Sequence, residues 1–304
     1  MARPRARART RRREPRHARD RAVARRQARR TRRAAARRRR ARVRRTAPDG
    51  TRLHAVVEPV VPAGAALSLR VLRQSSLSLD ALAAGGAVPP GWRALLRGLV
   101  AGRANVLISG GTGTGKTTLL AALLGLVPHD ERLVTVEEAR ELAPAHPHVV
   151  PLVTRRANVE GAGAVELTEL VRAALRMRPD RIVVGECRGA EVREVLLAMN
   201  TGHDGGMATV HANAVEHVPA RLEALAALAG MPREAVAAQA VAAVDVVLHV
   251  RREGGRRFVA AVGVVGRDGA GFEAREAARW DGASSQASVV DVCAWERVVG
   301  QWSS

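Results

Sequence analysis

The residues with the clearest chemical meaning form one glycine-rich segment, Gly110–Thr117, with the sequence GGTGTGKT. This segment satisfies the pattern G-x-x-x-x-G-K-[ST], and it lies between a strand-like and a helix-like run, as the motif requires. Glycines let successive backbone N–H groups converge on phosphate oxygens, and the positive end of the following helix favours the same anion. The segment therefore predicts a phosphate-binding loop for a nucleotide such as ATP.

Lys116 is the only lysine in the 304-residue chain, which otherwise uses arginine as its basic residue. Its ammonium group is expected on the β and γ phosphates, and the hydroxyl of Thr117 is expected to bind Mg²⁺. The composition indicates a GC-rich coding sequence in which lysine is rare, so a lysine at this position suggests that the chemistry requires it. A chance glycine-rich turn would not explain it.

Carboxylates follow two predicted strands of the same region. The apolar run 182–185 ends at Glu186, whose carboxylate would meet Mg²⁺ or its bound water at the carboxyl edge of a parallel sheet. Glu137 and Glu138 close the run 133–136, so either one could orient or deprotonate an attacking water. A solvated acidic helix start is the alternative interpretation of this pair.

His203 and His211 flank the predicted strand 207–210, and both are expected near the same edge of the sheet. There an imidazole could bond the γ-phosphate and report its loss. Each histidine taken singly is more often structural. No spacing of cysteine or histidine is that of a zinc site, and Cys187 and Cys293 are expected to be two reduced thiols in a cytosolic protein.

From about residue 104, apolar runs alternate between strand-like and helix-like periods, which predicts an α/β fold with helices around a parallel sheet. Two strands and two short helices ahead of this core are interpreted as the remnant of an N-terminal domain. The resulting domains are an arginine-rich tract at 1–46, the remnant with its linker at 47–100, an ATPase domain at 101–265 and a C-terminal tail of unclear structure at 266–304.

The net charge of +21 is concentrated in residues 1–46, which contain 23 arginines and two acidic residues, while the rest of the chain is neutral. This tract has no apolar periodicity and is predicted to be disordered. It is either a tail for nucleic acid or acidic lipid, or a product of reading GC-rich DNA in the wrong frame or from too early a start. Nucleic acid is an expected partner only through this tract.

No uncharged stretch reaches the roughly 18 to 20 apolar residues that span a bilayer. The N-terminus also lacks the apolar core of a signal peptide. The chain is therefore expected to be cytoplasmic, with no integral membrane segment and at most peripheral membrane contact.

The motifs together resemble those of the traffic ATPases of the type II/IV secretion superfamily, most closely the tight-adherence (Tad/Flp pilus, CpaF-like) branch and its conjugal-transfer-associated relatives. The matching segments are 110–118 (Walker A), 135–142 (Asp box), 176–189 (Walker B) and 198–213 (His box). The resemblance implies a RecA-like P-loop NTPase core with a parallel central sheet, preceded by a remnant of an N-terminal α+β domain. It also implies Mg²⁺-dependent ATP hydrolysis that powers pilus assembly or protein secretion.

The resemblance assigns roles to individual residues. Glu137 would be the catalytic carboxylate, Glu186 the Mg²⁺-associated one, and His203 and His211 the γ-phosphate sensors. The residues that would contact the nucleotide are Gly110, Gly111, Thr112, Gly113, Thr114, Gly115, Lys116, Thr117 and Thr118.

Arginines outside these motifs also match the family. Arg155 and Arg156 match an arginine-bearing loop that reaches a phosphate, across a subunit boundary in some arrangements, and Arg70 matches an arginine near the nucleotide. The relatives act as hexameric rings on the cytoplasmic face of the inner membrane, together with a secretion or pilus platform protein. This chain is expected to form such a homo-oligomer.

The sequence departs from the family in three respects. Glu138 stands where the family usually has Asp, Cys187 replaces an aliphatic residue, and only the arginine-rich tract precedes Pro48, where the family has a substantial N-terminal domain. Two alternative functions stay open. One is a DNA-transfer ATPase, whose hydrolysis DNA would stimulate with steep salt dependence; the other is a homologue that binds nucleotide without turnover.

Overall fold

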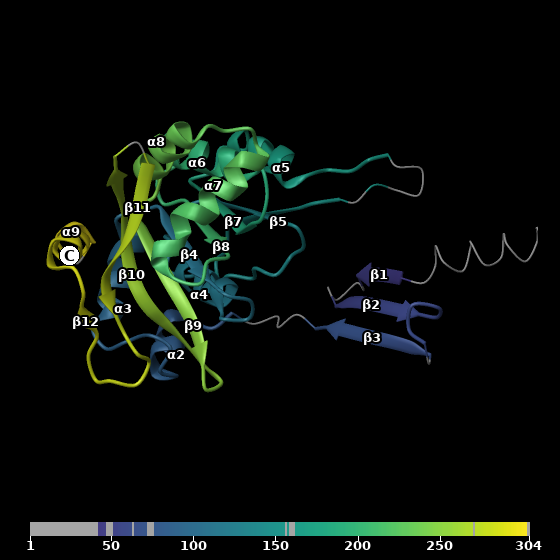
Figure 1. Cartoon of the computed structure of the whole chain (residues 1–304), viewed down its shortest axis with the longest axis horizontal. Helices are drawn as coiled ribbons and strands as arrows, with labels where there is room; N and C mark the ends of the chain where they lie inside the picture. Colours follow the sequence, from purple (N-terminus) through teal and green to yellow (C-terminus); the bar gives the residue numbers. More distant parts are fainter. Residues whose placement is uncertain are drawn as a thin grey trace, which may run out of the picture. The chain divides into compact units, whose positions relative to one another are not determined.

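The computed structural model describes residues 42–46, 51–62, 64–71, 76–155, 157, 162–269 and 271–302 (Figure 1). The chain divides into two compact units, 1–72 and 73–304. The boundary differs from the expected one near residue 100, because helices α2 (Leu79–Ala84) and α3 (Trp92–Ala101) belong to the larger unit. Most of the tract at 1–46 lies outside the described residues, and its predicted disorder is tested only at 42–46.

The smaller unit is a three-stranded antiparallel sheet in the order β1-β2-β3. Its strands are β1 (Arg42–Thr46), β2 (Arg52–Val57) and β3 (Ala65–Arg70). The end of the arginine-rich tract is therefore a strand that pairs with β2, contrary to the prediction of disorder for these five residues. Every side chain of β3 is exposed, including Leu67 and Leu69.

The larger unit is built on a nine-stranded sheet in the order β12-β11-β10-β9-β4-β8-β7-β5-β6. Neighbouring strands from β9 to β6 are parallel, and β10, β11 and β12 are added antiparallel. The parallel strands are β4 (Val106–Gly110), β5 (Leu133–Glu137), β6 (Val149–Val153), β7 (Arg181–Cys187), β8 (Met207–Val210) and β9 (Val246–Glu253). The predicted α/β fold class, with a mostly parallel sheet, is confirmed.

Helices cover both faces of this sheet and form two hydrophobic cores (Figure 1). Successive side chains of a strand point to opposite faces, so Val106 and Ile108 of β4 enter one core and Leu107 enters the other. The first core is completed by α2, α3, α4 (Lys116–Leu124) and α9 (Val292–Trp302). The second is completed by α5 (Leu167–Leu175), α6 (Val192–Asn200), α7 (Val218–Leu228) and α8 (Arg233–Ala243).

The segment 266–304, which has no clear element in the sequence, contributes ordered structure to the larger unit. Strand β10 (Arg256–Asp268) continues past residue 265 and pairs with β11 (Gly271–Arg279), which β12 (Ser288–Val289) extends. The sequence EAREAAR within β11 favours a helix by intrinsic propensity, but pairing with β10 holds it as a strand. The sheet thus does not end at the expected domain boundary.

The parallel strands position the candidate site. Because β4, β5, β7 and β8 run in the same direction, their carboxyl ends lie at one edge of the sheet. The glycine-rich segment, Glu137, Glu186 and His211 all occur at these ends.

Candidate nucleotide-binding site

The glycine-rich loop begins at Gly110, the last residue of β4, and ends at Lys116, the first residue of α4. Gly110 has a φ of +152°, and a Cβ atom there would lie 2.5 Å from the carbonyl oxygen of Val250 in the adjacent strand β9. Gly115, with a φ of +104°, caps the N-terminus of α4 in a left-handed conformation. Glycine is therefore required at both ends of the loop.

The threonines of the loop differ in exposure. Thr114 is buried, and its hydroxyl donates a hydrogen bond of 2.9 Å to the carbonyl oxygen of Gly111. Thr117 is half-buried in the first turn of α4, whereas Thr112 and Thr118 are exposed. Of these threonines, Thr114 thus bonds within the loop, and the hydroxyl groups of the other three are left for other partners.

Lys116 folds back into the loop. Its side chain is 8% exposed, and Nζ donates hydrogen bonds to the carbonyl oxygens of Gly110 (2.8 Å) and Gly111 (2.9 Å). Nζ also lies 4.0 Å from Oε1 of Glu186. Burial lowers the pKa of Lys116, and the nearby Glu186 carboxylate opposes that change. A phosphate bound at this position would therefore interact with a poorly hydrated ammonium group.

Glu186 lies at the end of β7 among several basic groups. Its Oε1 atom is 2.6 Å from Nε2 of His211, which follows β8, and its Oε2 atom contacts the guanidinium of Arg188. Although it is close to His211, the buried Oε1 atom accepts no aligned hydrogen bond among the described residues. Burial, followed by the charge of Lys116, lowers the pKa of His211, which favours the neutral imidazole near pH 7.

The donors at this edge fit Mg²⁺ in the company of a nucleotide. A carboxylate oxygen without an aligned donor and the hydroxyl of Thr117 are the hard oxygen ligands that Mg²⁺ prefers. Within the described ranges, no group of three or more acidic, histidine or cysteine side chains could hold a metal by itself. The arrangement suits an ion that takes most of its ligands from phosphate and water.

Glu137, the last residue of β5, is 4% exposed, and only one of its two carboxylate oxygens accepts hydrogen bonds in the described structure. Its Oε1 atom accepts hydrogen bonds from the backbone N–H groups of Glu141 (2.9 Å) and Leu142 (3.0 Å). Its Oε2 atom is buried without a hydrogen-bond partner in the described structure. Burial raises the pKa of Glu137, as expected for a carboxylate that accepts a proton.

The positions of Glu137 and Glu138 differ because each side chain has a different neighbour, Gly185 for the first and Arg188 for the second. A Cβ atom at Gly185 of β7 would lie 2.8 Å from Cγ of Glu137, so the glycine leaves room for this side chain beside Glu186. Glu138, in contrast, is exposed, and its Oε2 atom is 3.3 Å from the guanidinium of Arg188. The structure therefore separates a buried from an exposed carboxylate where the sequence left either one open.

The prediction that His203 and His211 lie at the same edge of the sheet is wrong. His211 follows β8, but His203 precedes it, and two ends of one strand lie at opposite edges. The loop after His203 packs at the amino end of the neighbouring strand, where a Cβ atom at Gly205 would lie 2.7 Å from Nη1 of Arg181, the first residue of β7. No ion pair or hydrogen bond among the described residues joins His203 to Glu186.

The predicted arginines come from other segments of the chain. Arg155 forms a two-way backbone bridge with Val165 in the segment after β6, and its guanidinium covers Gly163. Arg156 lies outside the described residues. Arg70 is an exposed residue at the end of β3 in the smaller unit.

Four residues that contact the loop or its carboxylates were not predicted. Arg188 bridges Glu186 and Glu138, and Ser109, immediately before the loop, hydrogen-bonds Nδ1 of the buried His249 at 2.9 Å. The Nε atom of Arg257 donates to the carbonyl oxygen of Gly113 at 2.8 Å. Arginine is the default basic residue of this chain, so composition alone did not mark either arginine.

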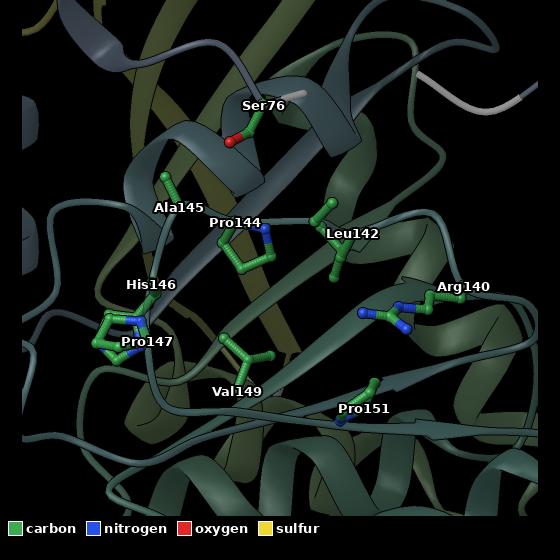
Figure 2. Close-up of a pocket in the computed structure, with 10 residues that line it drawn as sticks. Ser76, Arg140, Leu142, Pro144, Ala145, His146, Pro147, Val149 and Pro151 are labelled. Atoms are coloured by element: carbon green, nitrogen blue, oxygen red, sulfur yellow. The ribbon is translucent and has the colours of Figure 1, made fainter. Parts of the chain in front are cut away.

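A groove of about 550 Å³ lies beside the loop that follows Glu137 (Figure 2). Prolines, Leu142, Val149 and the guanidinium of Arg140 line it. Leu142 also donates its N–H to Glu137, so one wall of the groove is held by that carboxylate. None of the predicted site residues lines the groove itself.

A glycine-rich loop between a central parallel strand and a helix, with carboxylates at the ends of neighbouring strands, defines a P-loop NTPase of the RecA-like fold. The ATPase DotB of Legionella pneumophila has this fold with a TM-score of 0.51 and 22% identity, over 71% of this chain and 59% of DotB. A family model described as "Type II/IV secretion system protein" matches residues 12–291, and the chain belongs to that family. The predicted family is thereby confirmed.

Curated relatives are similar over the larger part of the chain. A protein of Mycobacterium tuberculosis named "Putative conjugal transfer protein" is 60% identical over 215 residues, which cover 70% of this chain and 61% of the relative. The conjugal transfer protein TrbB of Rhizobium radiobacter is 34% identical over 214 residues, which cover 68% and 62%. The chain thus spans about three-fifths of the length of these relatives. Among the described residues, no helix combines the length and hydropathy needed to cross a bilayer.

Proposed function

We propose that this chain binds Mg²⁺ and ATP at Gly110–Thr118, its Walker A segment, and hydrolyses the ATP as the motor of a secretion or conjugal-transfer apparatus. The observation that carries the proposal is the convergence of Lys116, Glu186 and His211 at the carboxyl edge of the sheet. Beside them, Glu137 keeps a buried oxygen without a partner. A chance glycine-rich turn would not bring these groups together.

In the proposed reaction, Lys116 exchanges the carbonyl oxygens of Gly110 and Gly111 for the β and γ phosphates. The hydroxyl of Thr117 and the Glu186 carboxylate would hold Mg²⁺, directly or through water. When bound, Mg²⁺ supplies charge neutralisation to the phosphates. Lys116 adds a second positive charge at the bond that breaks.

Glu137 is the proposed general base. Its Oε1 atom stays on the backbone N–H groups of Glu141 and Leu142, so Oε2 is the atom that accepts the proton of the attacking water. The raised pKa of Glu137 brings its basicity closer to neutral pH, where proton transfer is more effective. His211, beside Glu186, is the proposed hydrogen-bonding contact of the γ-phosphate.

The remaining parts of the proposal concern the assembly. Arg155, Arg156 and Arg70 would act on nucleotide in a homohexamer, where one subunit can complete the site of its neighbour. The ring would work in the cytoplasm, at the inner face of the plasma membrane, on a platform protein of the apparatus. The relatives named as conjugal transfer proteins support this setting, and the motif pattern supports the tight-adherence branch.

The direct test measures phosphate release by the purified chain with Mg²⁺, with EDTA in place of Mg²⁺, and with added DNA. Lys116→Ala should abolish both binding and turnover, while sizing with and without ATP reports the oligomer. Nucleotide binding without turnover in every condition would contradict the motor and leave an inactive homologue. Turnover that requires DNA would instead favour a nucleic-acid translocase.

A further inference from the structure

The two ends of the proposed nucleotide site can be distinguished along the sheet. The strand order is β10-β9-β4-β8-β7-β5, and the phosphate loop follows β4. Glu186, His211 and Glu137 lie at the ends of β7, β8 and β5, all on one side of β4. A nucleotide on the loop therefore points its γ-phosphate to that side, and its nucleoside points to the other side, towards β9 and β10.

Arg257, the second residue of β10, reaches the loop from this opposite side. Its Nε atom donates to the carbonyl oxygen of Gly113 at 2.8 Å, and its Cδ atom would lie 3.5 Å from a Cβ atom at Gly115. The side chain thus runs along the loop between these two glycines. Its backbone is fixed by antiparallel pairing with Arg252 of β9.

Most of the hydrogen-bonding capacity of Arg257 is unused. A guanidinium has five N–H donors, and the bond to Gly113 takes only the one on Nε. The two terminal amino groups make no hydrogen bond or ion pair with any described residue, and the side chain is exposed. The neighbouring Arg256 differs, because its terminal amino group donates to the carbonyl oxygen of Gly282.

We propose that Arg257 binds the nucleoside of the nucleotide through the free face and amino groups of its guanidinium. This inference rests on the proposed function and adds the residue that recognises the nucleoside end. The loop N–H groups and Lys116 would bind the phosphates, whereas the planar guanidinium of Arg257 can stack on the base, which an ammonium group cannot do. Arg257 then contributes equally to ADP and ATP affinity and leaves the chemical step unchanged.

Isothermal titration calorimetry on the full chain tests this with three ligands: ATP, ADP and inorganic tripolyphosphate, which lacks a nucleoside. Arg257→Ala should weaken ATP and ADP binding to the same extent, about tenfold, with tripolyphosphate changed less than about twofold. In turnover, KM for ATP should rise by that factor while kcat stays constant. An equal loss for ATP and tripolyphosphate would overturn the inference, because Arg257 would then act only on the loop or the phosphates.

Two further variants sharpen the result. Arg257→Lys retains a donor for Gly113 and the positive charge but lacks the planar group, so it should bind tripolyphosphate normally and ATP as weakly as Arg257→Ala. Recovery of ATP affinity in Arg257→Lys would overturn the nucleoside contact. Arg256→Ala is the matched control and should bind all three ligands as wild type does.

The wild-type chain separates failure of this inference from failure of the proposed function. If it binds tripolyphosphate and ATP equally well, the phosphate site stands and the nucleoside contact at Arg257 is overturned. If it binds neither ligand, the proposed function and the inference fall together.

Discussion

Glu137→Gln isolates the proton-accepting role of one buried carboxylate. The substituted side chain keeps an Oε1 atom for the N–H groups of Glu141 and Leu142, so the loop that these bonds hold should stay in place. The amide nitrogen replaces Oε2, the atom with no partner in the described structure, and it cannot accept a proton. We expect kcat to fall about 100- to 10,000-fold, the range for loss of a general base, with nucleotide affinity preserved.

The pH dependence of the rate follows from the same carboxylate. Only the deprotonated form of Glu137 accepts a proton, and burial raises its pKa above the ordinary value. The wild-type rate should therefore decline as the pH falls through this raised pKa, at a higher pH than an exposed glutamate would give. Glu137→Gln should remove this acidic limb from the pH profile of its residual rate.

Two matched variants make the Glu137 prediction refutable. Glu137→Ala should lose activity and also stability, because two backbone N–H groups lose their acceptor at a cost of about 1–3 kcal/mol each. Glu138→Gln changes an exposed carboxylate and should keep kcat within a few-fold. Steady-state phosphate release and urea denaturation measure these effects. If Glu138→Gln loses more turnover than Glu137→Gln, the assignment of the base is refuted.

Two further predictions concern stability. Glu131→Ala leaves the fully buried guanidinium of Arg181 without its carboxylate partner, so it should lower the free energy of unfolding by about 3–5 kcal/mol. The control, Glu223→Ala, breaks an exposed ion pair with Arg233 and should lower it by less than about 1 kcal/mol. Equal losses in urea denaturation would contradict this reasoning. Burial lowers the pKa of His249 to about 4 from 6.5, so protons bind the unfolded state first and stability should fall as pH drops from 6.5 to 4. His249→Gln should flatten that decline, and an unchanged slope would show that another group causes it.

The sequence predicted the parts of the fold that local patterns determine. The strand β8 has the predicted bounds 207–210, because a short apolar run follows a glycine pair and ends before His211. The segment after residue 266 was missed because its alanines, glutamates and arginines favour a helix when no partner strand is considered. Its strand depends on pairing with β10, which no local pattern contains.

The candidate site shows the same division between local and long-range information. The phosphate loop was predictable because its strand, turn and helix are consecutive in the sequence. Choosing between Glu137 and Glu138 required the fold, because the burial of Glu137 depends on Gly185 from another strand and on a loop that turns back to donate two N–H groups.

The wrong prediction for His203 could have been avoided from the sequence alone. Both histidines flank one predicted strand, and a residue before a strand cannot share the edge reached by a residue after it. The direction of the strand, already present in the sequence, thus separates them. Arg257 is the opposite case, because no local pattern joins it to a loop more than 140 residues away. Its contact arises because β10 pairs with β9, which is itself the neighbour of β4, and this order brings the start of β10 to the phosphate loop.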